Sequence, residues 1–148
     1  MVVIANVLEM ESFGKKIAAL AKPGLVIYLE GELGAGKTTF VRGFLRGFGY
    51  LDHVRSPTYN LFEIYEVKGQ VVCHMDLYRL KDPEEVVYFG VMDYFDNKNI
   101  CLIEWPEKGR GFLPKGDVLF KFDFTENPDE RVVDIKVLSS NGNDVVKA

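Results

Sequence analysis

The chain has 148 residues, a length that fits one folded domain, and its hydrophobic (47%) and charged (27%) fractions are those of an ordinary globular protein. A formal net charge of -4 argues against a free-standing nucleic-acid binder, which normally presents a strongly basic face. The opening residues lack the basic segment of a signal peptide, and no apolar run is long enough for a membrane span. We therefore expect a cytoplasmic protein with a single domain over residues 1–148.

The first part of the chain predicts a helix, a strand and a second helix. Residues 12–21 carry apolar side chains at helical spacing, with Ser12 placed to cap the N-terminus. The Lys-Pro-Gly turn at 22–24 ends this helix. Residues 25–29 form a continuous apolar run, which is typical of a strand buried on both faces. A second amphipathic pattern predicts a helix over 38–48.

A β-hairpin is predicted next. Aromatic and β-branched residues dominate 59–67, and a Lys-Gly turn leads into the apolar run 71–75. The sequence Asp82-Pro83-Glu84-Glu85 then has the signature of a helix start, with a cap, an early proline and acids in the first turn.

The remaining elements complete an α/β pattern. Residues 100–103 predict another buried strand, and the glycine- and proline-rich stretch 105–116 predicts a loop. Residues 118–124 and 131–137 predict two antiparallel strands, and the polar tail 139–148 is expected to fray. Strands and helices in this order predict an α/β domain with a central mixed β-sheet flanked by helices.

Residues 31–38, Gly-Glu-Leu-Gly-Ala-Gly-Lys-Thr, match the phosphate-binding pattern G-x-x-x-x-G-K-[ST] in full, between a predicted strand and a predicted helix. Such a P-loop lets backbone N–H groups surround phosphates at the positive end of a helix. Lys37 is expected to reach the β- and γ-phosphates, and the Thr38 hydroxyl to ligate Mg²⁺. The alternative, an accidental glycine-rich turn, is rare in this context. The expected nucleotide-binding residues are Glu32, Leu33, Gly34, Ala35, Gly36, Lys37, Thr38 and Thr39.

Two acidic residues each end an apolar run. Asp76 follows residues 71–75, and Glu104 follows residues 100–103. Either one by itself is most simply a surface carboxylate, but two such residues in a chain with a P-loop favour a metal-ligating or water-activating role. His74 is interpreted as a strand residue with its ring packed at the edge, and no His/Cys cluster suggests zinc.

Four motifs in this order resemble the TsaE family: Gly31–Thr39, Ser-Pro-Thr-Tyr at 56–59, His-Met-Asp-Leu-Tyr-Arg at 74–79 and Ile-Glu-Trp-Pro-Glu at 103–107. That family consists of small bacterial P-loop ATPases needed to make N6-threonylcarbamoyladenosine (t6A) in tRNA. The resemblance, from about Gly14 to Pro114, implies a P-loop NTPase-like α/β fold. It also implies an ATPase that uses ATP and Mg²⁺ and acts with TsaB and TsaD, the latter performing the transfer chemistry. Contact with tRNA would be indirect, through that complex.

The resemblance also implies roles for individual residues. Lys37 and Thr38 would bind phosphate and Mg²⁺, and Glu104 would complete the metal site. Asp76 would position or activate the attacking water, and Thr58 would lie in a switch-like loop that senses the γ-phosphate. The catalytic set implied is therefore Asp76, Lys37 and Thr58, with Thr38 and Glu104 as metal ligands.

Two further positions are left open by the resemblance. Trp105 matches a characteristic family residue, for which packing and contact with a partner are equal alternatives. Met10 stands where relatives often have a threonine that helps to enclose the base, so no adenine contact is assigned to it.

Three other functions compete with this one. A small-molecule kinase would need an arginine-rich lid, and the loop after the last motif offers Lys108, Arg110 and Lys115. A GTPase would use Asn-Lys-x-Asp, and residues 97–100, Asn-Lys-Asn-Ile, lack its aspartate. A non-catalytic module whose nucleotide only stabilises an assembly stays open, because weak turnover and a partner-dependent role look alike in sequence.

Overall fold

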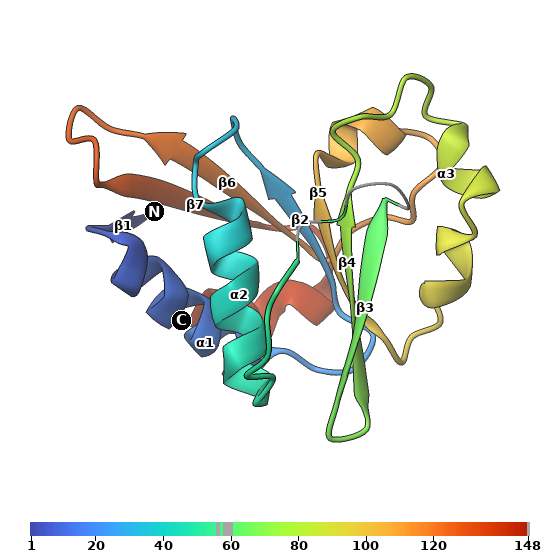
Figure 1. Cartoon of the computed structure of the whole chain (residues 1–148), viewed down its shortest axis with the longest axis horizontal. Helices are drawn as coiled ribbons and strands as arrows, with labels where there is room; N and C mark the ends of the chain where they lie inside the picture. Colours follow the sequence, from blue (N-terminus) through green and yellow to red (C-terminus); the bar gives the residue numbers. More distant parts are fainter. Residues whose placement is uncertain (56, 58–60, 148) are drawn as a thin grey trace.

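The structure, a computed structural model, describes residues 1–55, 57 and 61–147. Within them, one mixed sheet has the strand order β1-β7-β6-β2-β5-β4-β3 (Figure 1). The strands β6, β2, β5 and β4 run parallel to one another, and the pairs β1–β7, β6–β7 and β3–β4 are antiparallel. The predicted α/β fold with a mixed sheet is therefore confirmed. The strands are β1 (Val2–Ile4), β2 (Val26–Glu30), β3 (Phe62–Val67), β4 (Gln70–Asp76), β5 (Ile100–Glu104), β6 (Val118–Phe124) and β7 (Arg131–Val137).

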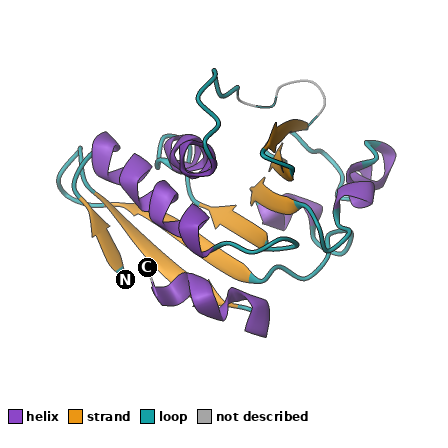
Figure 2. Cartoon of the chain, turned by 90° about the horizontal axis from the view of Figure 1, so that it is seen from below, coloured by secondary structure: helices purple, strands orange, loops and turns teal. Residues whose placement is uncertain are grey.

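Helices cover both faces of this sheet (Figure 2). The helices α1 (Val7–Leu20) and α2 (Lys37–Phe48) pack side by side on one face, where they share a core with alternate residues of the strands. The short helix α3 (Glu85–Tyr88) and the 3₁₀-helix η1 (Val91–Tyr94) pack on the other residues of β4 and β5. Two further 3₁₀-helices are η2 (Pro106–Gly109) and η3 (Ser140–Lys147).

Aromatic rings fix α2 against the sheet. Phe40, one turn into α2, has its ring centroid 5.3 Å from that of Phe120 and 5.7 Å from that of Phe122, both on β6. Phe13 of α1 lies 5.6 Å from Phe40, and Phe44 lies 6.3 Å from it. Edge-on and tilted aromatic pairs of this kind add to the free energy gained from burial. The start of α2, which follows the P-loop, is thereby held in place from two sides.

The prediction for α1 was wrong at its start. The helix begins at Val7 instead of residue 12, and Asn6 caps it by accepting a hydrogen bond from the Glu9 N–H at 2.9 Å. The Glu9 carboxylate in turn accepts from the Ala5 N–H at 2.8 Å. This reciprocal arrangement resembles a capping box, and Ser12 lies inside the helix. The strand β1, which pairs with β7, was not predicted at all.

Three other segments also differ from expectation. The helix expected to begin at Asp82 is a single short turn from Glu85, although the Asp82 carboxylate does accept from the Glu84 N–H. The predicted loop 105–116 contains η2. The tail expected to fray over 139–148 instead forms η3, and Val145 is fully buried in the core beside α1.

Asp117 explains why the tail is ordered. Its buried carboxylate accepts hydrogen bonds from the Val26 N–H at 2.8 Å and from the Ser139 hydroxyl at 2.5 Å. Its backbone carbonyl accepts from the N–H groups of Leu138 and Ser139. These bonds join the starts of β2 and β6 to the segment after β7, at the end of the sheet away from the P-loop.

The P-loop turn is built on glycines that no other residue could replace without strain. Gly31, Gly34 and Gly36 all have positive φ, at 156°, 81° and 105°. A Cβ on Gly31 would lie 2.7 Å from the Phe122 carbonyl oxygen, and one on Gly36 would lie 2.9 Å from the Met10 methyl. A Cβ on Gly34 would meet nothing within 4 Å. The loop backbone is therefore packed directly against β6 and α1.

We expect Gly31→Ala to lower the free energy of unfolding by roughly 3 kcal/mol, and Gly34→Ala by about 1 kcal/mol. Both substitutions strain the backbone, but only the first also drives a methyl group into a carbonyl of the sheet, which cannot move aside. Urea unfolding of the two variants beside the unsubstituted chain measures the difference. Equal losses at the two positions would show that contact with β6 does not constrain the loop.

Candidate functional site

The N-terminus of α2 is open toward the end of the sheet where β2, β4 and β5 finish. Gly36 is its N-cap, and among the described residues around this turn no side chain caps the helix and no acid lies in its first turn. The first N–H groups of a helix need partners from outside it, and they favour an anion. The geometry at this end of α2 is therefore that of an anion site.

A pocket of about 290 Å³ lies at this helix end, and it brings together most of the predicted site. It is lined by Leu33, Gly34, Gly36, Lys37, Thr38, Thr39, Asp76, Glu104 and Trp105. Two members of the predicted set do not line it. Ala35 is fully buried in the hydrophobic core, and Glu32 acts on the site through its charge near Lys37. Thr58 lies outside the described residues.

Lys37 is buried, with 4% of its surface exposed. Its ammonium group donates a hydrogen bond to the Gly31 carbonyl and lies 4.0 Å from the ring centroid of Trp105, a cation–π contact. Burial lowers the pKa of Lys37, and the negative charges of Glu104 and Asp76 oppose that shift. A cation is thus held over the loop and close to two carboxylates.

The two acids end neighbouring parallel strands at the same level. Asp76 of β4 is the register partner of Glu104 of β5, so both side chains reach the same edge of the sheet. Asp76 accepts a hydrogen bond from the Tyr78 N–H at 3.0 Å. Burial raises the pKa of Asp76, and the charge of Glu104 raises it further. Glu104 is more deeply buried, at 3% exposed.

His74 contacts the site through Glu104, which sequence reasoning missed, and its ring, expected to pack at the edge, lies instead within an interior strand of the sheet. The ring is fully buried, and its Nε2 lies 2.6 Å from Oε2 of Glu104. The sequence held one signal for this contact. His74 and Asp76 are two residues apart on one strand, so they point to the same face of the sheet, and Glu104 lies on the adjacent strand.

Trp105 packs within the site from a strained backbone. It has left-handed dihedral angles (φ 57°, ψ 51°), which cost a non-glycine residue roughly 1–2 kcal/mol. Its N–H donates to the Leu29 carbonyl at 3.2 Å, which ties the turn after β5 to the end of β2. The indole lies between Lys37 and the ring of Tyr78, whose centroid is 5.0 Å away. Of its two open roles, packing is observed, and contact with a partner stays a prediction.

A smaller pocket of about 90 Å³ adjoins the P-loop on the side of α1 and shares Gly34, Gly36 and Thr39 with the first. Its other lining residues are Asn6, Val7, Met10, Asp129 and Arg131. Arg131, at the start of β7, donates to the Gly34 carbonyl at 3.2 Å, and its guanidinium carbon lies 4.5 Å from the ring centroid of Phe124. Sequence reasoning did not find Arg131, because it reaches the loop only through the pairing of distant strands.

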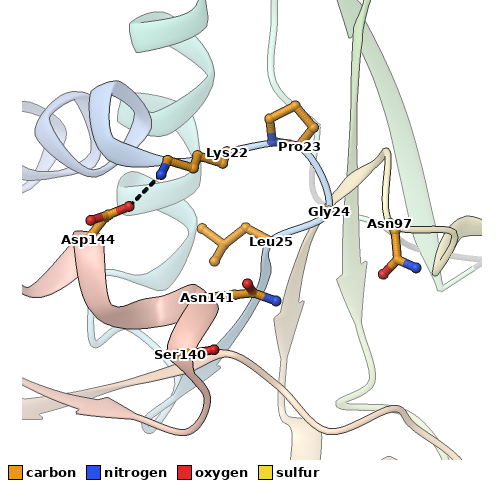
Figure 3. Close-up of a pocket in the computed structure, with 8 residues that line it drawn as sticks. All are labelled: Lys22, Pro23, Gly24, Leu25, Asn97, Ser140, Asn141 and Asp144. Carbon is orange, nitrogen blue, oxygen red and sulfur yellow. Dashed lines mark ion pairs between the residues drawn. The ribbon is translucent and has the colours of Figure 1, made fainter.

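Two other pockets lie away from the predicted site residues. One of about 370 Å³ lies at the opposite end of β2 (Figure 3), where the Lys22 ammonium pairs with the Asp144 carboxylate at 2.8 Å. It contains none of the predicted site residues, so volume does not identify the site here. Another, of about 280 Å³, is lined by Arg110 and Lys115 together with Tyr28. These two cations, the best candidates for a kinase lid, do not line the P-loop pocket.

The described residues contain no group of three or more His, Cys, Asp and Glu side chains that could hold a metal ion by themselves. The side chains with oxygen donors that line the P-loop pocket are Thr38, Thr39, Asp76 and Glu104. In the part of the chain that the structure describes, no helix is long and apolar enough to cross a membrane.

Comparison with known proteins gives one family by sequence. The family model described as "Threonylcarbamoyl adenosine biosynthesis protein TsaE" matches residues 4–133. The tRNA threonylcarbamoyladenosine biosynthesis protein TsaE of Haemophilus influenzae is 43% identical over 98% of this chain and 94% of its own length. The protein of the same name from Bacillus subtilis is 44% identical over 72% of this chain and 66% of its own.

Among solved structures, the crystal structure of Bacillus subtilis YdiB superposes with a TM-score of 0.80 at 29% identity, covering 99% of this chain and 90% of that one. The family model, the relatives and the fold agree, and the chain belongs to the TsaE family of threonylcarbamoyladenosine biosynthesis proteins.

Proposed function

We propose that this chain is a Mg²⁺-dependent ATPase that supports the formation of t6A in tRNA. Its family takes part in threonylcarbamoyladenosine biosynthesis. The observation that carries the ATPase proposal is the P-loop pocket, in which an uncapped helix N-terminus, a buried lysine and two strand-end carboxylates share one space. Each of these groups answers a separate need of phosphoryl transfer, namely charge neutralisation, metal ligation and activation of water.

The triphosphate is bound by the loop and Lys37. Backbone N–H groups of the P-loop and of the first turn of α2 donate to its oxygens, and Lys37 supplies a charge-assisted contact. The lysine already lies in the pocket wall, held by the Gly31 carbonyl and the Trp105 ring. Because both contacts hold the ammonium group near the loop, little side-chain freedom is lost when it turns to phosphate.

Mg²⁺ would be held by the Thr38 hydroxyl and the Glu104 carboxylate, with phosphate oxygens and water as further ligands. Such a site fits the residues present, because Mg²⁺ prefers hard oxygen donors and is usually bound through one or two carboxylates plus substrate phosphates. When bound, the cation neutralises charge on the phosphate oxygens.

Asp76 is proposed to orient the attacking water and to accept its proton. It lies beside Glu104 at the open edge of the sheet and lines the same pocket. Its raised pKa suits this role, since a carboxylate becomes a better base as its pKa moves toward neutral pH. The smaller pocket between α1 and Arg131 adjoins the loop at Gly34 and Gly36, and we propose that the nucleobase lies on this side of the loop, with no contact assigned to Met10.

ATP turnover is proposed to act through a TsaB–TsaD complex, with tRNA reached only through that complex. The resemblance to the family supports this, and the net charge of -4 suits a protein that meets other proteins better than one that grips tRNA. Thr58, which lies outside the described residues, is the predicted sensor of the γ-phosphate.

Removing the charge of Lys37 tests the loop. Lys37→Met keeps the buried stem but loses the ammonium group, so ATP affinity should fall roughly tenfold to a hundredfold, the equivalent of about 1.5–3 kcal/mol. Calorimetric titration measures this, and Lys16→Met, at an exposed lysine of α1, is the matched control. If a folded Lys37→Met variant binds ATP as tightly as the control, the loop is not the phosphate site.

Substitution of the two acids separates their roles. Glu104→Ala should weaken nucleotide binding in the presence of Mg²⁺ and leave metal-free binding nearly unchanged, because its carboxylate serves the cation. Asp76→Asn should keep Mg²⁺-dependent binding and lower hydrolysis by roughly a hundredfold or more. Titrations with and without Mg²⁺, followed by phosphate-release assays, distinguish them. The opposite pattern would exchange the two assignments.

Association with TsaB and TsaD tests the biological role. Affinity should be at least about fivefold higher with ATP than with ADP or without nucleotide, within the usual range of coupling between sites. Thr58→Ala should reduce this difference more than it reduces ATP binding itself. Equal affinity in all three nucleotide states would remove the coupling, because a ligand that binds two states equally shifts neither. Retained t6A formation without hydrolysis, in Asp76→Asn, would instead support a non-catalytic assembly role.

A further inference from the structure

The imidazole of His74 makes one polar contact that reaches the site. The residue lies in the middle of β4, opposite Leu102 of β5, and no part of it is exposed. From there its ring reaches along the sheet to Glu104, with 2.6 Å between Nε2 and Oε2. A carboxylate only accepts, so Nε2 carries the proton and donates. The bond thus joins the interior of the sheet to the carboxylate at its edge.

Packing does not account for a histidine at this position. Among the described residues the other ring nitrogen, Nδ1, has no hydrogen-bond partner. A buried polar atom without a partner costs free energy. Val72 and Leu102, the neighbours of His74 in the sheet, are fully buried apolar residues, and a similar side chain would fill the space without that cost. The compensating gain is the bond to Glu104.

This bond restricts what Glu104 can do. Oε2 accepts the hydrogen bond from the imidazole, so Oε1 is the carboxylate oxygen whose lone pairs this bond does not use. The bond also fixes the orientation of a side chain that would otherwise rotate about three torsions. Among the described residues, Asp76 has no comparable hydrogen bond from a side chain, and its carboxylate accepts one from the Tyr78 N–H. Of the two acids, Glu104 is therefore the one held rigidly from within the sheet.

We propose that His74 is a positioning residue for the magnesium site, acting through Glu104 and not on the nucleotide. This inference rests on the proposed function, because it assumes that Glu104 ligates Mg²⁺. Groups that hydrogen-bond to metal ligands fix the ligand orientation, and their loss typically lowers metal affinity tenfold to a hundredfold. The role is confined to Mg²⁺-dependent binding, since the phosphates themselves are held by the loop and by Lys37.

The test uses three substitutions in the full chain. His74→Gln can place an amide N–H near the position of Nε2, whereas the shorter side chain of His74→Asn cannot reach Glu104, and His74→Leu carries no donor. Affinity for a non-hydrolysable ATP analogue is measured by calorimetry with and without Mg²⁺, and thermal unfolding reports folding. The ratio of the two affinities is the readout, because a merely structural role would lower both together.

We expect the Mg²⁺-dependent gain in affinity to fall roughly tenfold to a hundredfold in the Asn and Leu variants and to be largely retained in the Gln variant. In a Glu104→Gln background, His74→Asn should cause no further loss. If either His74→Asn or His74→Leu does not fold, the other provides the comparison with His74→Gln.

An unchanged ratio in a folded Asn or Leu variant would overturn the inference and leave the proposed function intact. An equal loss in all three variants, with and without Mg²⁺, would also overturn it and assign His74 to packing. A failure of the unsubstituted chain to bind the analogue would instead overturn the proposed function, and this inference would fall with it.

Discussion

The close approach of the P-loop backbone to its neighbours is the constraint on which the site depends. Gly31 lies against the Phe122 carbonyl and Gly36 against the Met10 side chain, so the turn after β2 has one available path. That path places Lys37 at the first position of α2 and opens the helix N-terminus toward the strand ends. The ring cluster around Phe40 then prevents α2 from moving off β6. The open helix N-terminus that we propose as the phosphate site is thus a consequence of how tightly the turn is packed.

The Lys37 ammonium stabilises two carboxylates in this pocket that repel one another. Lys37 is buried beside Glu104 and Asp76, and an isolated buried charge would be expensive. The lysine is further supported by a carbonyl and an aromatic face, and Glu104 by an imidazole. Removing any one of these groups leaves the others poorly compensated, so the effects of paired substitutions at these positions should not add.

Local patterns predicted the parts of the site that lie within single elements. The P-loop and the acids that end β4 and β5 were found because each belongs to a short contiguous signature. The contacts of His74 and Arg131 were not found, because they depend on which strands become neighbours and in what register. The start of α1 was predicted wrongly for a different reason. Asn6 and Glu9 form the cap, but Ser12 lies closer to the periodic apolar residues, and this favoured Ser12 in the sequence. The tail was misjudged from its polarity, since its order comes from Asp117 far along the chain.

Trp105 is the single tryptophan of the chain, and it lies where the chemistry is proposed to occur. Its indole is 4.0 Å from the Lys37 ammonium and packs on the ring of Tyr78. The environment of the indole is therefore set by the charge of Lys37 and by the Tyr78 ring. Selective excitation of tryptophan therefore interrogates this one location, free of signal from the seven tyrosines. Trp105 is therefore an intrinsic fluorescent probe, and its emission depends on the position of the Lys37 ammonium group without an attached dye.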